Sequence, residues 1–368
     1  MLLEVRGLRT YVRQRQSIVR AVDGVSFHLD AGETLGLVGE SGSGKTMTGM
    51  SLIRLLPPGG YLAGGSITFA GREVTTMREQ EIRELRGRDI GVIFQDPMTS
   101  LNPTMTIGRQ IAESVELHRR VPAKEASERA VEVLSLVGMP RPAERACDYP
   151  HQLSGGLRQR VMIAIALACE PKLLIADEPT TALDVTIQRQ ILELLDELKA
   201  RLKMAMILIT HDLGVIAGRA DRVAVMYAGQ LVEEASILDL FAETRHPYTE
   251  ALLASIPRLD ERQERLYSIP GMPPDLRTIP VGCRFAPRCR YSAPDCRSDG
   301  PVLERAEEGH AVACFHPVTT VAADAIGRPY VMSRQQHACS GAHGCPLSRA
   351  RRSLQAARPN HCSSSIMS

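Results

Sequence analysis

The chain has 368 residues, of which 44% are hydrophobic and 23% charged, and this balance excludes a chain that is disordered throughout. Its 44 basic and 42 acidic residues give a formal net charge of +2, which, with an aromatic content of only 4%, speaks against a nucleic-acid partner. The longest apolar run, residues 161–169, is far shorter than the roughly 18 residues that span a bilayer, and the first residues lack the apolar stretch of an export signal. We therefore expect a cytoplasmic protein of two or three domains that reaches a membrane only through a partner.

The N-terminal part of the chain is predicted to contain strands and one helix. Residues 2–8 and 21–29 alternate in places and contain β-branched side chains, which predicts two extended segments. The apolar run at 34–38 predicts a buried strand. Residues 45–56 are predicted to be helical up to the Pro-Pro pair at 57–58.

The middle of the chain predicts a parallel α/β sheet with a helical insertion. Residues 97–161 are rich in helix formers and carry no strong strand signal. The runs at 173–177 and 205–210 predict buried strands, and apolar residues recur between them at helical spacing. Strand, helix and strand in this order indicate a parallel sheet. Residues 222–233 predict a hairpin that turns near Ala228 and Gly229.

The composition changes after about residue 245. Residues 246–317 are rich in Pro, Arg and Cys, whereas the last fifty or so residues are polar and rich in Ser and Arg. A segment of the second kind is expected to be mostly disordered. We therefore predict three parts, at 1–245, 246–317 and 318–368.

A glycine-rich loop follows the strand at 34–38 and fits the pattern G-x-x-x-x-G-K-[ST]. Its residues are Gly39, Glu40, Ser41, Gly42, Ser43, Gly44, Lys45 and Thr46. The glycines let successive backbone N–H groups surround phosphate oxygens, Lys45 supplies a positive charge, and Thr46 offers a hydroxyl to Mg²⁺. The alternative is a chance glycine-rich turn, which the strand before the loop and the helix after it disfavour.

Two acidic residues, Asp177 and Glu178, mark the carboxyl end of the strand predicted at 173–177. This end of a parallel strand lies at the edge of the sheet where ligands bind. Asp177 can hold Mg²⁺, and Glu178 can orient and polarise an attacking water. The alternative is an ordinary Asp-Glu-Pro turn, which the phosphate loop upstream disfavours.

A second anion-binding pattern precedes the apolar helix that begins at Val161. Ser154 has the character of a helix N-cap, Gly155 and Gly156 allow close approach of the backbone, and the stretch continues to Gln159. The alternative is a plain Ser-capped helix, which the position of the pattern shortly before Asp177 and Glu178 disfavours. The chain thus carries two separate half-sites for a triphosphate.

In this order the motifs resemble those of the ATP-binding subunits of ABC transporters, over about residues 2–317. The resemblance implies that Gln95 touches Mg²⁺ and the attacking water, that Asp184 belongs to the D-loop, and that His211 contacts the γ-phosphate. It makes Tyr11 the best candidate for the aromatic ring that stacks on adenine. The alternatives are a solvated loop glutamine, a hydrogen-bonded histidine at a strand end and a packed aromatic, respectively.

Three stretches place the resemblance within one group of the family. They are Phe-Gln-Asp-Pro-Met-Thr-Ser-Leu-Asn-Pro at 94–103, Asp-Tyr-Pro-His-Gln-Leu-Ser-Gly-Gly at 148–156, and Arg-His-Pro-Tyr-Thr at 245–249. They are typical of the D-type ATPases of oligopeptide and dipeptide importers. The fold implied is α/β: a P-loop NTPase core of the RecA-like kind with an N-terminal antiparallel β region, a helical subdomain and a small Cys-rich C-terminal domain.

The same resemblance implies an ATP-hydrolysing subunit that powers peptide uptake from the cytoplasmic face of the membrane. The partners implied are two transmembrane permease subunits, a second ATPase subunit that is identical or related, and, indirectly, an extracytoplasmic substrate-binding protein. Related importers carry glutathione or nickel complexes. The substrate is selected by the permease and any extracytoplasmic binding protein, so this sequence does not identify it. A soluble ABC ATPase acting on DNA or ribosomes is less favoured, because the chain has one ATPase unit and no heptad run. An inert subunit is disfavoured by the presence of both Lys45 and Glu178.

Four cysteines lie close together in the C-terminal part, at Cys283, Cys289, Cys296 and Cys314. None forms a C-x-x-C pair, so their spacing is unlike a zinc finger and by itself favours free structural thiols. The resemblance implies instead that the four thiolates bind a [4Fe–4S] cluster, which four cysteines suit. His310 and His316 are close enough in the sequence to be rival ligands.

Overall fold

The computed structural model describes residues 1–318 except for 182, 257–267 and 306–308, and these residues belong to one compact unit. An antiparallel sheet of order β2-β1-β4-β5 contains β1 Leu3–Arg13, β2 Ile18–Leu29, β4 Gly60–Phe69 and β5 Arg72–Glu73. A larger central sheet has the order β11-β12-β10-β9-β3-β8-β7-β6. Its strands are β3 Thr34–Val38, β6 Ile90–Ile93, β7 Leu173–Asp177, β8 Ala205–Thr210, β9 Arg222–Tyr227, β10 Gln230–Ser236, β11 Glu304–Arg305 and β12 Ala311–Val312. The tail predicted at 318–368 lies outside the described residues except for Val318.

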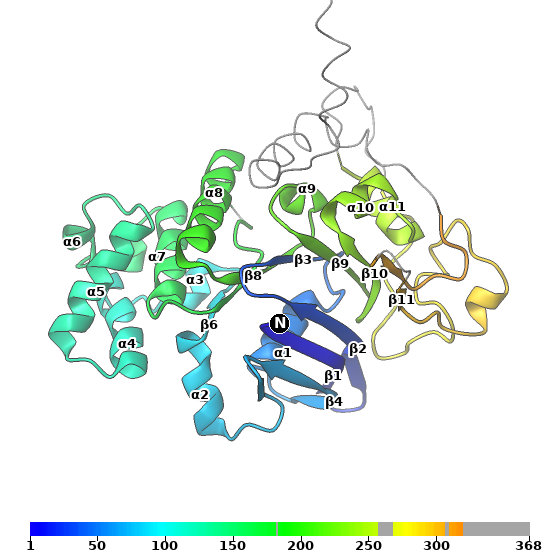
Figure 1. The fold of residues 1–368 in the computed structure, drawn as a ribbon, viewed down its shortest axis with the longest axis horizontal. Coiled ribbons are helices and arrows are strands. Elements are labelled where there is room, and N and C mark those ends of the chain that lie inside the picture. The colour runs from blue at the N-terminus through cyan, green and yellow to red at the C-terminus, as the bar shows by residue number, and fades with distance from the viewer. Residues whose placement is uncertain (182, 257–267, 306–308, 319–368) are drawn as a thin grey trace, which may run out of the picture. The chain divides into compact units, whose positions relative to one another are not determined.

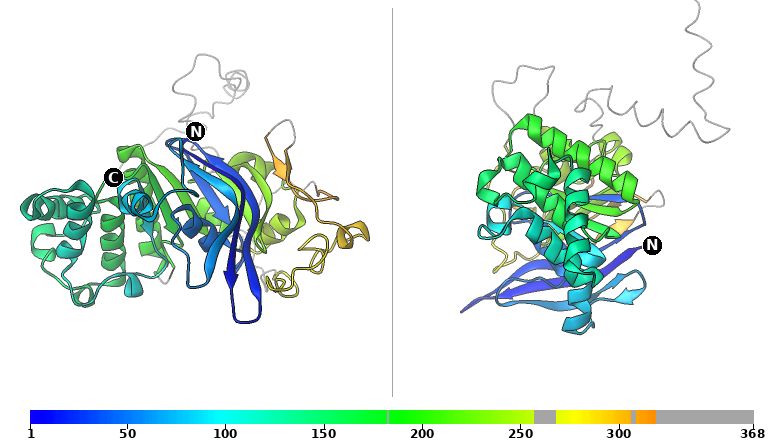
Figure 2. Two further views of the ribbon diagram at one scale, coloured as in Figure 1. Left: turned by 90° about the horizontal axis from the view of Figure 1, so that it is seen from below. Right: turned by 90° about the vertical axis from the view of Figure 1, so that its left-hand side faces the viewer.

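The central sheet is parallel from β6 to β9 and is covered on both faces. Every residue of β3, β7 and β8 is buried, as expected for parallel strands that are packed on both sides. Alternate side chains point to two different cores: Leu173 and Ile175 pack toward the antiparallel sheet, whereas Leu174 and Ala176 pack toward the helices. Figures 1 and 2 show the antiparallel sheet as a separate layer against the central sheet.

The sequence predictions for the central strands are confirmed. β3, β7 and β8 have the predicted bounds, and β7 and β8 are joined by the predicted helix, α8 Val185–Leu202. The predicted hairpin is formed by β9 and β10. Ala228 and Gly229 both have positive φ angles, of 47° and 86°, which is the backbone conformation that matches the twist of a tight two-residue hairpin.

The helical insertion is also confirmed. Residues 97–167 form helices and their connections: α3 Pro97–Ser100, α4 Ile107–Arg119, α5 Ala123–Leu136, α6 Pro142–Arg145, the 3₁₀ turn Pro150–Gln152 and α7 Gly155–Leu167. Within α4, buried Ile107, Ile111 and Val115 recur every fourth residue and give the helix one apolar face. Among the described residues, no helix has both the length and the apolar character needed to cross a bilayer. Figure 2 shows α4 to α6 beside the central sheet, apart from the antiparallel sheet.

Several local predictions differ from the structure. The helix α1 runs over Lys45–Leu52 and so ends earlier than residue 56. The reason is local: Arg54 takes a left-handed φ of 52°, and the N–H of Leu55 donates back to the carbonyl of Met50. The strands β4 and β6 and the helix α2 Glu79–Arg88 were not predicted. β4 contains three glycines, which weaken the strand signal in the sequence.

The C-terminal described residues pack directly against the central sheet. α9 Leu213–Ile216 precedes β9 and α10 Ile237–Ala242 follows β10, while the C-terminal part itself contains α11 Pro247–Ala254 and the 3₁₀ turn Asp295–Arg297. β12 adds antiparallel to β10 and so extends the sheet. Phe285 packs against Tyr227 of β9 and Tyr248 of α11, with ring centroids 5.2 and 5.4 Å away. A boundary between two domains at residue 245 remains a prediction.

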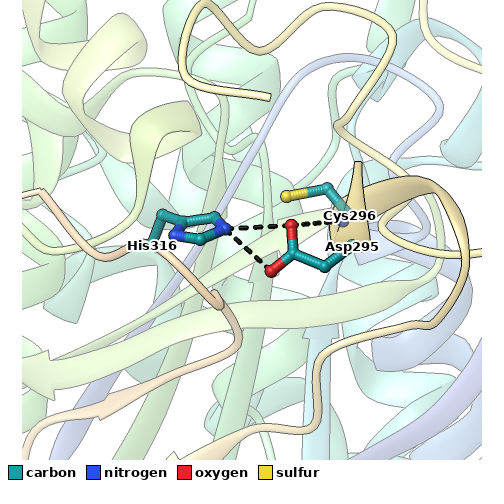
Figure 3. Close-up of side chains that lie close together, drawn as sticks. All are labelled: Asp295, Cys296 and His316. Carbon is teal, nitrogen blue, oxygen red and sulfur yellow. Dashed lines mark hydrogen bonds and ion pairs between the residues drawn. The ribbon is translucent and has the colours of Figure 1, made fainter. Parts of the chain in front are cut away.

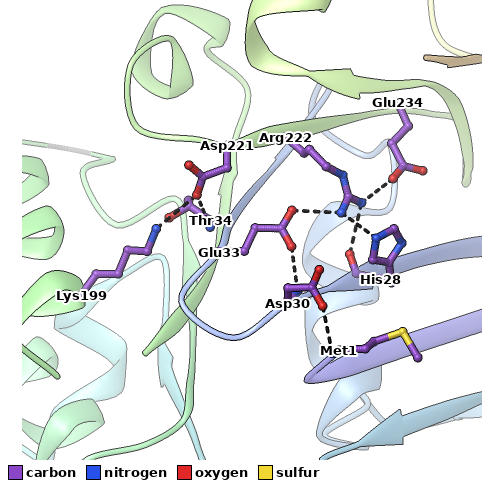
Figure 4. Close-up of polar contacts among 9 residues, drawn as sticks. All are labelled: Met1, His28, Asp30, Glu33, Thr34, Lys199, Asp221, Arg222 and Glu234. Atoms are coloured by element: carbon purple, nitrogen blue, oxygen red, sulfur yellow. Dashed lines mark hydrogen bonds and ion pairs between the residues drawn. The ribbon is translucent and has the colours of Figure 1, made fainter. Parts of the chain in front are cut away.

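A polar network joins the antiparallel sheet to the central sheet, as Figure 4 shows. The guanidinium of Arg222 on β9 donates to Glu33 at 2.9 Å, to Glu234 at 2.5 Å and to the carbonyl of His28 at 3.2 Å. Next to it, Asp221 accepts from the backbone N–H of Thr34 at 2.8 Å. Because β2 and β3 are consecutive strands in different sheets, these contacts fix how the chain crosses from one layer to the other just before the phosphate loop.

Candidate nucleotide-binding site

The predicted phosphate loop lies between β3 and α1, at the carboxyl edge of the central sheet. Gly44 has a φ of 105°, and a Cβ there would lie 2.3 Å from the carbonyl oxygen of Ala21. At Gly39 a Cβ would lie 2.1 Å from the carbonyl oxygen of Met226. Glycine is therefore required at both positions, by close backbone contacts and, at Gly44, by the left-handed conformation. The result is a tight loop at the N-terminus of α1, where backbone N–H groups favour an anion.

Lys45 is folded over this loop. Its Nζ donates to the carbonyl of Gly39 at 2.6 Å and to that of Glu40 at 2.9 Å, and the residue is only 5% exposed. Burial lowers the pKa of Lys45, while the nearby carboxylates of Glu178 and Asp177 oppose that change. A desolvated ammonium group at a loop built for anions is well suited to bind phosphate oxygens.

Thr46 and Asp177 form the candidate magnesium ligands. The hydroxyl of Thr46 donates to Asp177 Oδ1 at 3.1 Å. Asp177 is 2% exposed, and burial raises its pKa to about 6, against the opposing hydrogen bond from Thr46 and the charge of Lys45. A hydroxyl and a carboxylate are oxygen ligands of the kind that Mg²⁺ prefers, and a divalent cation would hold Asp177 in its ionised form.

Three predicted catalytic side chains come together at the ends of adjacent strands. Gln95 follows β6, Glu178 follows β7 and His211 follows β8. The carboxylate of Glu178 accepts from Gln95 Nε2 at 3.0 Å and lies 3.2 Å from His211 Nδ1. Thr181, which the sequence did not indicate, donates to the same carboxylate at 2.9 Å. Three neighbouring residues therefore fix the orientation of Glu178.

The backbone of Glu178 is itself strained. Its φ is 45°, a left-handed conformation that typically costs about 1–2 kcal/mol for a residue with a side chain. The N–H of Glu178 donates to the carbonyl of Ile209 at 2.9 Å, which ties the turn to β8. Strain of this kind is common where the fold must present one side chain in a set direction.

The loop and the catalytic side chains line a single open cavity of about 910 Å³. Lys45, Thr46, Gln95, Glu178 and His211 all contribute to its lining. Its other wall comes largely from the C-terminal part of the chain, with Ala21 from β2. The residues of that wall are Ala21, Leu252, Ser255, Ser268, Ile269, Pro273 and Leu276. The C-terminal residues of this wall were not predicted, because they lie more than two hundred residues from the phosphate loop in the sequence and no motif marks them.

Tyr11 is not among the residues that line the cavity. Its ring lies edge-on to Tyr61, with centroids 6.2 Å apart, and its hydroxyl donates to Asp23 at 2.8 Å. The stacking of Tyr11 on adenine stays a prediction. Ile269 and Leu276 contribute apolar side chains to the cavity.

The second anion-binding pattern is on the surface, outside this cavity. Ser154 caps α7, its Oγ accepting from the N–H of Leu157 at 3.4 Å, and Asp184 caps α8 by accepting from the N–H of Ile187 at 3.0 Å. Both caps are exposed. A Cβ at Gly156 would lie 2.9 Å from the side chain of Ile187, so the two caps lie close together.

Gly155 is exposed next to Ser154, but Gln159 is buried within α7. Its Nε2 has no hydrogen-bond partner among the described residues. The exposed part of the pattern therefore consists of Ser154, Gly155 and, in part, Gly156. It offers backbone N–H groups at a helix N-terminus to a ligand that comes from outside the chain.

The four predicted cysteines line one small cavity in the C-terminal part. All four are unpaired thiols. Burial raises the pKa of Cys283 and Cys289, and raises that of Cys314 to about 11, with the neighbouring thiols adding to the effect. Backbone hydrogen bonds to the sulfur atoms act in the opposite direction: they come from Phe285 and Ala286 to Cys283, and from His316 to Cys314.

The two histidines proposed as rival ligands have different positions. His310 is buried away from the cysteine-lined cavity, with Nε2 2.8 Å from Glu233 Oε1. His316 does line the cavity, and its Nε2 lies 2.9 Å from Asp295 Oδ2. Figure 3 shows His316, Asp295 and Cys296 directed toward one another, with one potential ligand atom of each within 4.8 Å of the others.

Comparison with known proteins gives two matches to family models. Residues 22–181 match the model described as ABC transporter, and residues 232–296 match the model described as oligopeptide/dipeptide transporter, C-terminal region. The first match contains the phosphate loop and the two acids at the end of β7. The second contains three of the four clustered cysteines.

Several similar proteins align with most of the chain. A probable peptide ABC transporter ATP-binding protein of Sinorhizobium fredii is 54% identical over 317 residues, which are 86% of this chain and 95% of that protein. The oligopeptide transport ATP-binding protein OppD of Escherichia coli is 51% identical over 86% of this chain and 94% of its own. Among solved structures, a dimeric ATP-binding cassette, MJ0796, bound to ADP and phosphate has a TM-score of 0.58 and 26% identity, and covers 64% of this chain and 99% of its own.

Proposed function

Because this chain belongs to the ATP-binding proteins of the ABC transporters, and within them to the oligopeptide and dipeptide transport group, we propose that it is the ATP-hydrolysing subunit of a peptide importer. The observation that carries this proposal is the position of Glu178. Its carboxylate is held by Gln95 and lies beside His211, at the edge of the cavity that Lys45 and the phosphate loop also line.

The residues of this site have separate roles in ATP hydrolysis. Lys45 and the loop N–H groups bind the phosphates. Thr46 and Asp177 would hold Mg²⁺, which neutralises charge on the transferring phosphoryl group. Glu178 orients the attacking water and accepts its proton, and Gln95 and His211 keep the carboxylate in place. The strained turn at Glu178 sets this geometry before ATP arrives.

A complete site requires a second ATP-binding subunit. The exposed Ser154 and Gly155 and the partly exposed Gly156 lie outside the cavity of their own chain, so they are free to contact ATP bound by a partner. A dimer of such subunits, identical or related, closes on two ATP molecules and opens after hydrolysis. The relative MJ0796 is described as dimeric.

The transported substrate is proposed to be a peptide, because the relatives are named for oligopeptide transport. The subunit works at the cytoplasmic face with two permease subunits, and it reaches the extracytoplasmic binding protein only through them. Importers of glutathione or nickel complexes are the alternative.

Uptake by the assembled transporter tests this function. Vesicles that contain the permeases and both ATPase subunits, with the binding protein on the extracytoplasmic side, are expected to transport a labelled oligopeptide when ATP is supplied on the cytoplasmic side. The nonhydrolysable analogue of ATP serves as the control. ATP-dependent uptake of nickel or glutathione, with no uptake of di- or oligopeptides, would contradict the choice of substrate but not the ATPase assignment.

We also propose a [4Fe–4S] cluster on Cys283, Cys289, Cys296 and Cys314. Four unpaired thiols that line one cavity are a donor set that fits such a cluster, and backbone N–H groups directed at the sulfur atoms favour thiolates. The described C-terminal part has few helices and strands, so a cluster would also stabilise it.

Anaerobically purified protein is expected to contain about four iron and four sulfide per chain, as a cluster with four cysteine ligands requires. Cys296→Ser is expected to remove most of both, because it removes one of four ligands. The matched control is Cys147→Ser, at an exposed cysteine outside the cavity. One zinc per chain and no sulfide would instead favour a mononuclear site at Asp295, Cys296 and His316. Protein free of both metals would contradict the cluster.

A further inference from the structure

The second residue of the phosphate loop is held by a residue from the C-terminal part of the chain. The guanidinium of Arg288 donates to both carboxylate oxygens of Glu40, at 2.6 and 2.9 Å. The side chain of Arg288 is 4% exposed and that of Glu40 is 26% exposed. A paired, charge-assisted contact with this much shielding from water is among the stronger polar interactions in proteins, and it fixes direction as well as distance.

The same guanidinium holds the opposite wall of the cavity. Its Nε donates to the carbonyl of Pro270 at 2.9 Å, and Nη2 lies 3.4 Å from the carbonyl of Ile269. Ile269 lines the cavity opposite the phosphate loop. One side chain therefore connects the loop that binds phosphate with the wall that faces it.

A second contact between the same two regions supports the first. The backbone N–H of Glu40 donates to the hydroxyl of Tyr248 on α11 at 2.7 Å. The ring of Tyr248 packs against Tyr227, with centroids 4.6 Å apart, and against Phe285. Both the backbone and the side chain of Glu40 are thus held by residues that follow β9.

The position of Arg288 depends in turn on the cysteine-lined segment. The N–H of Arg288 donates to the carbonyl of Phe285 at 2.9 Å, and that of Ala286 donates to the carbonyl of Cys283 at 3.0 Å. Successive turns therefore run from Cys283 to Cys289 with Arg288 at their end. The backbone that carries the guanidinium is fixed by a segment that begins and ends at cavity cysteines.

The charge of Glu40 explains why this contact matters for the nucleotide. A carboxylate in the phosphate loop lies near the place where a triphosphate binds, and like charges repel. Arg288 both neutralises this charge and orients the carboxylate. Without Arg288, an uncompensated negative charge would remain beside the phosphates.

From these contacts we infer that Arg288 is a positioning residue for ATP binding, through which the cysteine-lined segment sets the affinity of the phosphate loop. This inference rests on the proposed ATP site. It gives a role to Arg288, a residue between two of the clustered cysteines to which the sequence assigned none.

Titration with a fluorescent ATP analogue tests the inference on the full chain. Arg288→Gln is expected to raise the Kd about tenfold or more, the size of effect that follows loss of a paired, partly buried charge. Glu40→Gln, which removes the contact together with the repulsive charge, is expected to raise it by no more than about threefold. The decisive variant is the double one: Glu40→Gln is expected to restore binding in the Arg288→Gln background.

The matched control is Arg290→Gln, on the other side of Cys289. Arg290 is 61% exposed and pairs with Glu250 at 2.7 Å, away from the loop, so its substitution is expected to leave the Kd unchanged. Thermal unfolding of each variant separates loss of fold from loss of affinity. If Arg288→Gln is insoluble, Arg288→Lys replaces it, with an expected rise of about threefold, because the charge is kept and the paired geometry is lost.

Two results would overturn the inference: a normal Kd in folded Arg288→Gln or Arg288→Lys, or a double variant as weak as the product of the two single effects. Lys45→Ala is measured in the same titration. If it too binds ATP normally, the assignment of the ATP site has failed rather than the role of Arg288.

Discussion

Glu178→Gln is expected to lower ATP hydrolysis by the assembled transporter by about 10²–10⁴-fold, the usual contribution of a general base, while ATP binding changes little. Glutamine keeps the size and one acceptor oxygen of the side chain, so contacts with Gln95 and Thr181 can persist. It cannot accept the proton of the attacking water. The measurement is steady-state phosphate release beside equilibrium binding of ATP.

Glu178→Gln is also expected to accumulate as the ATP-bound dimer, because ATP binding brings the two subunits together and hydrolysis no longer separates them. Solution mass in the presence of ATP and Mg²⁺ is expected to move from the monomer to the dimer. The control is Glu193→Gln, at a 54% exposed glutamate on α8 that pairs with Arg189. Hydrolysis within tenfold of the unsubstituted protein would exclude Glu178 as the base.

Lys45→Ala is expected to weaken ATP binding by about a hundredfold, with a corresponding loss of transport, because truncating a buried charge that contacts a charged ligand costs about 2–5 kcal/mol. Lys45 is almost fully buried and already lies over the phosphate loop. The measurement is a titration with ATP, together with ATP-driven uptake.

The thermal stability of Lys45→Ala is expected to rise or to stay unchanged, although its ATP affinity falls. Burial lowers the pKa of Lys45, which means that the fold holds a charge in an unfavourable place. Its removal should therefore leave the thermal midpoint unchanged or raise it. The control is Lys172→Ala, at a lysine whose side chain is 62% exposed, at the start of β7. A large loss of stability with normal ATP affinity in the folded fraction would assign Lys45 to the fold rather than to the ligand.

The sequence was most informative where one local rule determined the structure. Continuous apolar runs predicted β3, β7 and β8 to the residue, because parallel strands are buried on both faces. The placement of Glu178 and His211 at one edge follows from their positions after β7 and β8, since the carboxyl ends of parallel strands share one edge. The role of Gln95 was implied only by the resemblance, because β6 was not predicted.

Contacts distant in the sequence could not be predicted in this way. No pattern links Glu40 to Arg288 or the phosphate loop to Ile269, because these contacts depend on how the C-terminal part folds back on the sheet. The surroundings of Tyr11 likewise depend on strand pairing: β1 sets it opposite Tyr61, and its hydroxyl donates to Asp23. Its role as the ring that stacks on adenine, which the resemblance implies, stays a prediction.

The short strand β12 pairs with β10 and covers its outer edge, although it comes near the end of the described residues. Ala311 and Val312 pair with Glu234 and Glu233 of β10, and nearby His310 meets the fully buried carboxylate of Glu233. During synthesis the nucleotide-binding part therefore emerges from the ribosome well before this strand does. A product that terminated at residue 300 would contain every motif for ATP yet present bare β10 amides to its neighbours, a form prone to aggregate through edge pairing. We therefore expect the part of the chain up to β10 to become soluble only once β12 has emerged and paired with it.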